Sequence, residues 1–371
     1  MSAGILTPDW APFYAAVPRS LFLPETIWPF DMDKGSSVTV SRATDPETWQ
    51  DYALADVPIV TQWDDGEHTG HDPGTVPTSS ASMPSVVFSM LSALDVQAGH
   101  RVLEIGTGTG WSAALLAHRL GPGNITTLEV DPALSERARG ALRRAGYAVG
   151  AVCADGALGY PRRAPYPRII ATCAVRAIPP AWIEQCAPGG VIVTPWGTHW
   201  GNGDAVVKLV TAANGRSATG HFVGPVEFMK LRDQRQPPVQ HKDYVTPDAE
   251  REERTSSLTA DEFLGDRFDP LQFALGLRVP QCVRVVATPE DGRQPVWLYS
   301  LADRSWACAL FKGQQPTQVW ESGPRRLWAE VESSCAWWNS HGKPAHDRFG
   351  LTVTPHEQTA WLDSPDNHWP V

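Results

Sequence analysis

The segment RVLEIGTGTG, residues 101–110, constrains the fold more than any other part of the chain. Its apolar residues predict a short buried strand, interrupted by Glu104 and followed at once by Gly106, Gly108 and Gly110. The next residues, WSAALLAHRL, are good helix formers with an apolar stripe, and a Gly-Pro pair then predicts the end of a helix. A strand, a glycine turn and a helix in this order let the backbone approach a ligand closely, at the N-terminus of the helix.

A glycine-spaced turn alone is also typical of a plain connection between strand and helix, so the next segment matters. A second apolar strand, residues 125–130, carries Glu129 near its end, 19 residues after Gly110. An acid at about this distance grips ribose hydroxyls in mononucleotide-binding βαβ units. The pattern G-T-G-T-G, preceded by Glu104, resembles the first motif of S-adenosylmethionine-dependent methyltransferases. A carboxylate suits a cationic methionine group better than a phosphate cradle does, which disfavours NAD.

The region from residue 17 to about residue 230 alternates predicted strands and helices. Beyond the glycine segment the predicted elements are a helix over residues 132–145 with Asp131 as N-cap, strands over 148–154 and 164–175, and a helix, a Gly189-Gly190 turn and a fifth strand before residue 197. This alternation predicts an α/β fold, Rossmann-like, with a doubly wound and mainly parallel sheet.

The first 75 residues are predicted to form an N-terminal segment and lid. A short helix is expected within residues 7–16, and residues 26–75 are predicted mostly as loop. Acids and histidines gather near the end of this loop: Asp64, Asp65, His68, His71 and Asp72. Their spacing fits no metal-ligand rule, so we interpret them as a solvated polar loop and expect no metal.

A polar run over residues 76–84 leads into Pro84 and a predicted amphipathic helix over residues 85–94. Ser82 stands two residues before the proline. It could cap this helix by accepting a hydrogen bond from a backbone N–H. It could also hold a carboxylate at the helix N-terminus, and the two roles are compatible.

Past residue 232 the composition changes. Residues 234–257 are hydrophilic and predict a linker, whereas half of the 16 tryptophans lie beyond residue 290, in runs that predict strands and one helix over residues 325–339. We therefore expect a methyltransferase domain over residues 76–232 and a linker with an α+β domain over residues 233–371. Its tryptophans could recognise a peptide or fill a core, and the sequence leaves both open.

Charge and cysteine usage exclude some classes of protein. The net charge of −10 argues against a protein that binds the phosphate backbone of nucleic acids. The six cysteines form no C-x-x-C pair, which indicates ordinary buried thiols in a reducing compartment. The N-terminal residues lack a signal-peptide pattern and no segment is apolar enough to span a bilayer, so a cytoplasmic protein of unknown oligomeric state is expected.

Several ordered motifs over residues 17–200 resemble protein-L-isoaspartate O-methyltransferases. VPRSLFLPE at residues 17–25 matches the phrase V-P-R-x-x-F-x-P-E, and residues 80–84 match T-x-S-x-P, which implies that Ser82 is the active-site serine. Asp155-Gly156 stands where these enzymes receive the adenine ring.

The phrases FMKLR, GPRRLW and RFGLTVTP, which begin at residues 228, 323 and 348, resemble a variant group encoded beside ATP-grasp peptide-maturation enzymes. That resemblance implies methylation of an aspartate in a ribosomally made, ATP-grasp-crosslinked precursor peptide (a graspetide), followed by closure to an aspartimide (succinimide). Repair of isoaspartate in proteins is the alternative. A non-catalytic module that binds a leader or crosslinked peptide is a third possibility.

The residues and the resemblance together assign roles in the site. Ser82, helped by Thr78 and Ser80, is expected to hydrogen-bond the acceptor carboxylate, which is ionised at neutral pH and requires no general base. In-line methyl transfer would then depend on alignment and desolvation. The expected ligands of S-adenosylmethionine are Glu104, Gly106, Thr107, Gly108, Gly110, Glu129, Asp155, Gly156 and Thr172, and the expected substrate floor is Cys173, Ala174 and Val175.

Overall fold

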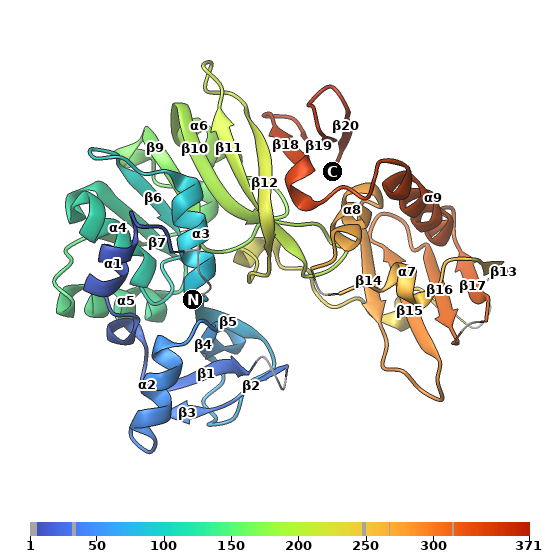
Figure 1. Cartoon of the computed structure of the whole chain (residues 1–371), viewed down its shortest axis with the longest axis horizontal. Coiled ribbons are helices and arrows are strands. Elements are labelled where there is room, and N and C mark those ends of the chain that lie inside the picture. The colour runs from blue at the N-terminus through green and yellow to red at the C-terminus, as the bar shows by residue number, and fades with distance from the viewer. Residues whose placement is uncertain (1–5, 32–34, 247–249, 267, 314) are drawn as a thin grey trace. The chain divides into compact units, whose positions relative to one another are not determined.

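The computed structural model describes residues 6–31, 35–246, 250–266, 268–313 and 315–371 (Figure 1). Contacts within the chain divide it into two compact units. Unit 1 comprises Met1–Cys173, Ile178–Thr194 and Lys208–Thr219, and unit 2 comprises Ala174–Ala177, Pro195–Val207 and Gly220–Val371. The chain passes between the units several times, so the division does not fall at a single residue.

A parallel sheet forms the core of unit 1. In it β6 (Val102–Ile105) lies between β7 (Ile125–Glu129) and β9 (Tyr166–Ala171), and β8 (Gly150–Cys153) and β10 (Cys186–Trp196) extend it on the two sides. Every residue of β6 and β7 is buried, as expected for a parallel sheet covered on both faces. The predicted α/β fold is confirmed.

The helices α3 (Pro84–Leu94), α4 (Trp111–Leu120) and α5 (Pro132–Arg144) of unit 1 begin and end close to the predicted residues. α3 packs on β9, α4 on β7, and α5 on β7 and β8. α1 (Ala11–Ala16) packs on α4, and α6 (Pro180–Gln185) precedes β10. Proline in the first turn of α3, α5 and α6 is compatible with a helix start, because that N–H has no partner within the helix.

Unit 1 also contains a small antiparallel sheet where the sequence predicted mostly loop, so that prediction was wrong. Its elements, blue in Figure 1, are β1 (Thr26–Asp31), β2 (Ser36–Ser37), β3 (Val40–Ser41), α2 (Pro46–Leu54), β4 (Ile59–Trp63) and β5 (Pro77–Ala81). Ile27, Trp49 and Ile59 fill a core of its own. The strands are short and β1 contains Pro29, so neither length nor strict alternation identified them.

The strands β10, β11 (Asp204–Thr211) and β12 (Ala218–Val226) contribute residues to both units. Gly189 and Gly190, predicted as a turn, lie inside β10, where the register against β9 shifts between Cys186 and Val191. The pair is therefore an irregularity within a strand, and Gly189 has a φ of +71°.

Unit 2 adds strands and helices beyond β12. Next to β12 lie, in order, β18 (Phe349–Val353), β19 (Gln358–Leu362) and β20 (His368–Pro370). A separate antiparallel sheet has the order β13 (Glu252–Ser256), β17 (Thr317–Ser322), β16 (Trp306–Phe311), β15 (Gln294–Ser300) and β14 (Cys282–Val286), with helices α7 (Ala260–Phe263), α8 (Pro270–Arg278) and α9 (Leu327–Ser340). The predicted linker is thus shorter than expected, because β13 lies within it.

Short 3-10 turns connect many of these elements: Arg19–Phe22, Asp64–Gly66, Pro122–Asn124, Gly156–Leu158, Pro161–Arg163, Arg232–Gln234, His241–Asp243 and His346–Arg348.

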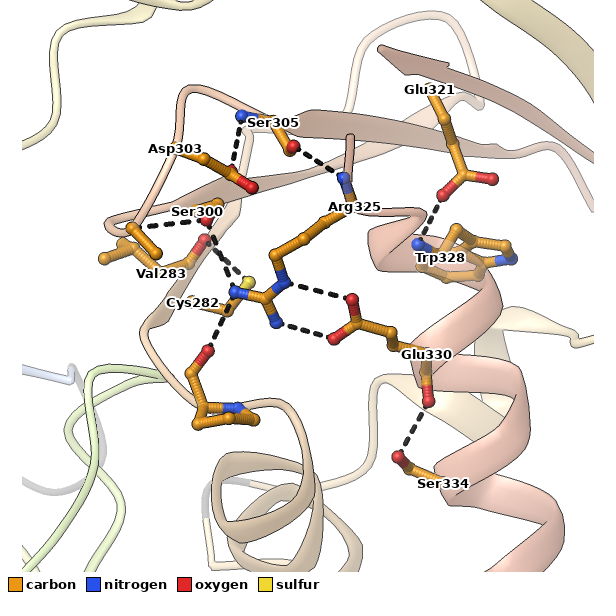
Figure 2. A network of polar contacts seen from close by, with 12 residues as sticks. Cys282, Val283, Ser300, Asp303, Ser305, Glu321, Arg325, Trp328, Glu330 and Ser334 are labelled. Carbon is orange, nitrogen blue, oxygen red and sulfur yellow. Dashed lines mark hydrogen bonds and ion pairs between the residues drawn. The ribbon is translucent and has the colours of Figure 1, made fainter. Parts of the chain in front are cut away.

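Arg325 of the GPRRLW phrase links the strands and the helix α9 of unit 2 (Figure 2). Its guanidinium donates to both carboxylate oxygens of Glu330, at 3.0 and 2.6 Å, and to Pro280 O and Ser300 Oγ. Its backbone N–H donates to Ser305 Oγ at 2.9 Å. The hydrogen bond with Glu330 raises the pKa of Arg325. The phrase therefore has a structural role in unit 2.

The tryptophans of unit 2 pack inside it. Of the eight beyond residue 290 none is exposed: Trp306, Trp328 and Trp361 are buried, and the other five are half-buried. Such burial favours the filling of a core over direct contact with a peptide.

Two further expectations concern side chains that could bind metals or react. Among the described residues no group of three or more His, Cys, Asp or Glu side chains is placed to hold a metal ion, and Asp64 instead accepts the N–H groups of Thr75 and Val76. Cys153 is exposed, so the expectation of buried thiols was wrong for this residue. In the same described part of the chain no helix has the length and apolar character needed to cross a membrane.

Candidate active site

The glycine segment forms a tight loop at the carboxyl end of β6. Gly106, Gly108 and Gly110 all have positive φ, at +88°, +54° and +94°. A Cβ on Gly106 would lie 2.9 Å from Thr172 Oγ1, so a larger residue would collide there. The N–H groups of Gly106 and Thr107 both donate to Leu128 O of β7, at 2.9 and 3.0 Å. The loop lies between β6 and β7, next to the β6–β9 pair at which the strand order reverses, which is where open α/β sheets bind ligands.

Glu104 is a fully buried acid with only part of its hydrogen-bonding capacity used. Thr127 Oγ1 donates to its Oε2 at 2.6 Å, and Thr127 is in turn bonded to Thr107 Oγ1 at 2.7 Å. Burial raises the pKa of Glu104 to about 7, although Thr127 and the nearby Ser112 hydroxyl act in the opposite direction. Its Oε1 has no hydrogen-bond partner among the described residues. An acid of this kind is suited to a cationic ligand, which would compensate the buried charge.

Glu129 stands at the end of β7, as predicted. Its Oε2 accepts the N–H of Gly108 at 2.9 Å and its Oε1 accepts the N–H of Asp131 at 3.1 Å. Asp131 is the predicted N-cap of α5, and its Oδ1 accepts the N–H groups of Ala133 and Leu134 at 2.8 and 3.0 Å. The acid that is expected to grip ribose is therefore held against the glycine loop by the backbone.

Gln62 of β4 links this acidic end of the sheet to the small antiparallel sheet. It is buried, its Nε2 donates to Asp131 Oδ2 at 3.2 Å, and its Oε1 accepts the hydroxyl of Thr78 at 3.0 Å. The sequence analysis did not identify Gln62, because it lies in a segment predicted as loop. The Thr78 O–H is already donated to Gln62, so assistance by Thr78 to a substrate would require an exchange of this bond.

Asp155 and Gly156 lie beyond the end of β8, at the same edge of the sheet. The Asp155 carboxylate is exposed and accepts the N–H of Ala157 at 2.9 Å, which opens the short turn Gly156–Leu158. Gly156 is buried, and its carbonyl accepts the indole N–H of Trp182 at 2.8 Å. This edge of the sheet therefore carries Glu104 near the end of β6, Glu129 at the end of β7 and Asp155 in the turn after β8.

The predicted floor, residues 172–175, is divided by the structure. Thr172 packs against the glycine loop and its hydroxyl donates to Gly106 O. Cys173 is half-buried in unit 1. Ala174 and Val175 belong to unit 2 and have no exposed surface. Their part in binding a substrate stays a prediction.

Ser82 follows β5 and precedes α3, but it does not cap this helix. The N-cap of α3 is Met83, without a side-chain hydrogen bond, and the N–H of Ser85 donates instead to Asp56 Oδ1 at 2.8 Å. In the described part of the chain the half-buried Ser82 hydroxyl makes no hydrogen bond. The structural alternative for Ser82 was therefore wrong, and Asp56, which sequence reasoning missed, occupies that position from a loop 29 residues away.

Two contacts place the Ser82 segment beside the glycine loop. A Cβ on Gly108 would lie 3.5 Å from Ser80 O and 3.9 Å from Ser79 Oγ, so β5 runs past this loop at van der Waals distance. A glycine at residue 108 thus keeps the two backbones close, with Ser82 two residues further along.

Arg19, from the VPRSLFLPE phrase, holds the end of β5. Its guanidinium is buried and donates to the carbonyl oxygens of Ala55, Val57 and Ala81 at 3.3, 3.0 and 2.7 Å. Burial lowers the pKa of Arg19 to about 10, which leaves it charged at neutral pH. Because Ala81 immediately precedes Ser82, this clasp fixes the backbone from which the serine projects.

The residues of unit 1 fit S-adenosylmethionine. The unpartnered Glu104 Oε1 suits a cation, the glycine loop leaves room for close backbone approach, and Glu129 and Asp155 lie at adjacent strand ends. We expect Gly110 and Thr107 to shape the loop rather than to bind by side chain, since Gly110 is buried against Ala138 and Leu142 and Thr107 is bonded to Thr127.

Comparison with known proteins agrees with this geometry. A sequence model described as protein-L-isoaspartate(D-aspartate) O-methyltransferase matches residues 46–236. The protein-L-isoaspartate O-methyltransferase of Ignicoccus hospitalis is 43% identical over 116 residues, which cover 31% of this chain and 55% of that one. The enzyme of the same name from Methanococcoides burtonii is 36% identical over 188 residues, which cover 50% of this chain and 84% of that one. The chain thus spans little more than half of the first of these relatives.

A solved structure of a protein-L-isoaspartate O-methyltransferase has a similar fold over 97% of this chain and 96% of its own, with a TM-score of 0.53 and 19% identity. The fold is that of class I S-adenosylmethionine-dependent methyltransferases. The match over residues 46–236 includes Ser82, the glycine loop and both strand-end acids. The chain therefore belongs to the protein-L-isoaspartate(D-aspartate) O-methyltransferase family, whose cofactor is S-adenosylmethionine.

Proposed function

We propose that this protein is a carboxyl O-methyltransferase that methylates the free α-carboxylate of isoaspartyl residues in peptides and proteins. The observation that carries the proposal is the Ser82 hydroxyl, which makes no hydrogen bond to any described residue and follows Ala81, whose carbonyl group Arg19 holds beside the glycine loop. The family match supports isoaspartate as substrate better than the crosslinked precursor peptide that the sequence motifs implied.

S-adenosylmethionine would supply an electrophilic methyl group on a cationic sulfur. Glu104, Glu129 and Asp155, with the backbone of Gly106 and Gly108, are the groups that would hold it. The acceptor carboxylate has a reference pKa of about 4 and is ionised at neutral pH, so the protein needs no general base. Its contribution is to orient that carboxylate and exclude water from it.

Ser82 would donate one hydrogen bond to the acceptor oxygen that does not react. Such a bond to a charged group contributes about 1.5–3 kcal/mol when it is well placed. The resulting methyl ester has a better leaving group than the carboxylate. The next backbone nitrogen can therefore attack the ester carbonyl, close a succinimide and release methanol without help from the protein.

The test uses two synthetic peptides that differ only in carrying isoaspartate or aspartate at one position. We expect mass spectrometry to show the gain of one methyl on the isoaspartyl peptide, followed by loss of methanol, and no reaction of the aspartyl peptide. Calorimetric titration with S-adenosylhomocysteine should show binding in parallel. Cofactor binding without methylation of either peptide would contradict isoaspartate as the substrate, and no cofactor binding would support a non-catalytic binding module.

A second candidate is methylation of an aspartate in an ATP-grasp-crosslinked peptide. It is favoured by the FMKLR, GPRRLW and RFGLTVTP phrases of unit 2, of which GPRRLW carries the Arg325 network. The matched pair here is a crosslinked precursor and its linear form, neither containing isoaspartate. Methylation of only the crosslinked form would establish this substrate, whereas reaction of neither form would leave isoaspartate repair as the function.

A further inference from the structure

A groove runs along α5 in unit 1, starting at the glycine loop. Its first part is a cleft of about 680 Å³ that is lined by Gly108 and Thr109, by the face of α5, and by residues 21–24. A second cleft of about 440 Å³ adjoins it and extends to Glu25 and Arg42. The two clefts share Leu21, Leu23, Pro24 and Arg144 as lining residues, and together we call them the α5 groove.

The α5 groove has a mostly apolar floor with a glycine in its helical wall. Leu21, which is 53% exposed, faces the same cleft as Ala141 and Gly140 of α5. A Cβ on Gly140 would lie 3.2 Å from Arg144 Nη1, a contact that a small shift of this exposed guanidinium would relieve.

Two arginines of the groove have no acidic partner. Arg42 lies 3.9 Å from Glu25, and Arg143 and Arg139 pair with Glu136 at 3.3 and 3.5 Å. Arg137 and Arg144 are exposed and make no hydrogen bond or ion pair within the described residues. The groove therefore has a local excess of positive charge, although the chain as a whole has a net charge of −10.

The spacing of these two arginines matches an extended polypeptide. They are seven residues apart, so they lie on the same face of α5 and about 10 Å apart along its axis. An extended chain covers that distance in about three residues. An apolar floor between two unpaired guanidinium groups fits a backbone with carboxylate side chains near its two ends.

We propose that the α5 groove binds an extended acidic segment of the polypeptide substrate, next to the residue that is methylated. Carboxylates of that segment pair with Arg137 and Arg144. This inference rests on the proposed methyltransferase function and adds to it the charge of the preferred substrate. The groove is lined at one end by Gly108 and Thr109 of the glycine loop, which is the link between this groove and the proposed site of methyl transfer.

The test compares two isoaspartyl peptides that differ only in having glutamate or glutamine at positions flanking the isoaspartate. For the wild-type protein we expect the acidic peptide to have a KM about three- to tenfold lower, because two exposed ion pairs contribute up to about 1 kcal/mol each. The kcat should be the same for both peptides. The Arg137→Gln/Arg144→Gln variant should lose the preference, because the KM for the acidic peptide rises to that for the neutral one.

Two control variants accompany this test. Arg137→Lys/Arg144→Lys keeps the charges and should retain most of the preference. Arg216→Gln removes an exposed arginine outside the groove and should change nothing. An equal KM for the two wild-type peptides, or a preference that survives in the double glutamine variant, would overturn the inference.

A binding measurement separates this inference from the methyltransferase proposal. Fluorescence anisotropy with the labelled acidic peptide needs no turnover. If neither peptide is methylated but the acidic one binds and the double glutamine variant does not bind it, the groove is correct and the proposed function is wrong. Competition by a single-stranded RNA of equal charge that exceeds competition by the acidic peptide would contradict a polypeptide occupant.

Discussion

The structure excludes one of the two roles that the sequence offered for Ser82. Its position before Pro84 fitted both a helix cap and a substrate contact. In the structure Asp56 makes the hydrogen bond to the N–H of Ser85, so the serine has no structural bond to lose. A free hydroxyl at this point is what contact with a substrate requires.

Replacing Ser82 with alanine should therefore lower methyl transfer far more than stability. We expect kcat/KM to fall roughly 10- to 100-fold, the equivalent of one hydrogen bond to a charged group. The affinity for S-adenosylhomocysteine and the melting temperature should hardly change. Ser89→Ala, on the exposed side of α3, is the matched control. An equal loss of cofactor affinity would mean that Ser82 acts only on the shape of the site.

Glu104 should make the stability of the cofactor-free protein depend on pH. Its pKa is raised from 4.5 to about 7 by burial, so the folded state holds a proton that the unfolded state releases. Its stabilising contribution is fully present below about pH 4.5 and is lost as the pH rises through about 7. The loss is on the order of 3 kcal/mol.

Glu104→Gln cannot ionise and should lack this part of the pH dependence. Urea unfolding of the wild type and the variant at several pH values from about 5 to about 8 gives the free energy of unfolding of each. The difference between the two free energies should increase as the pH rises. The wild-type affinity for S-adenosylmethionine should also increase over this range, because the cation favours the ionised acid. Parallel stability curves for the two proteins would contradict a titrating Glu104.

At the scale of an element, the N-terminal phrase VPRSLFLPE acts through Arg19 on β5, the strand that precedes Ser82. Arg19 donates to three carbonyl groups that belong to the ends of α2, β4 and β5 or lie next to them. Lysine keeps the charge but cannot make this fork of hydrogen bonds. We therefore expect Arg19 to position the segment that carries Ser82 rather than to contact the substrate.

Arg19→Lys should lower kcat without an equal effect on the affinity for S-adenosylhomocysteine, since Ser82 moves and the glycine loop does not. Stability should fall by about 1–3 kcal/mol, because buried carbonyl groups lose their donors. Arg216→Lys, at an exposed position, is the control. A loss of stability with unchanged kcat, measured well below the melting temperature, would show that the clasp is only structural.

At the scale of the whole molecule, unit 2 depends on a buried ion pair. Lys230 of the FMKLR phrase donates to both oxygens of Asp204 at 2.6 Å, and their side chains are 9% and 0% exposed. Burial raises the pKa of Asp204 to about 6, while Lys230 and Arg176 lower it. Removing Lys230 would therefore leave the buried carboxylate of Asp204 without the positive charge that now offsets the cost of its burial.

Lys230→Met should destabilise the protein by about 3 kcal/mol or more at pH 8, where Asp204 must ionise. The pKa of Asp204 should rise further in this variant, so the loss should shrink as the pH falls and the acid becomes protonated. Chemical unfolding at several pH values measures this loss of stability. The Asp204→Asn/Lys230→Met double variant removes both charges and should recover part of the loss. A pH-independent effect would exclude this explanation.

Much of the fold could be predicted because its signals are local. The strands β6 and β7 are short and buried, and they alternate with the helices α4 and α5, whose ends carry recognisable signals such as the N-cap Asp131. The small sheet over residues 26–81 could not be predicted in this way, because its short strands gain stability only by packing on one another around Trp49.

Some residues of the candidate site could likewise be predicted from the sequence, and others could not. Gly106, Gly108 and the acids Glu104 and Glu129 were identified from sequence spacing, since a strand, a turn and a helix place them together locally. Gln62 and Asp56 were not, because each acts on a residue far away in the sequence.

By itself the sequence determined the type of sheet, the position of the glycine loop and the family resemblance, because these depend on patterns within a few residues. Only the tertiary structure decided that Ser82 does not cap the helix, that Arg19 holds the preceding strand, and that Arg137 and Arg144 have no acidic partner among the residues that the structure describes. Each of these facts depends on which residues, distant in the sequence, are brought within hydrogen-bond distance of a polar group. Only the packing of the folded chain determines that.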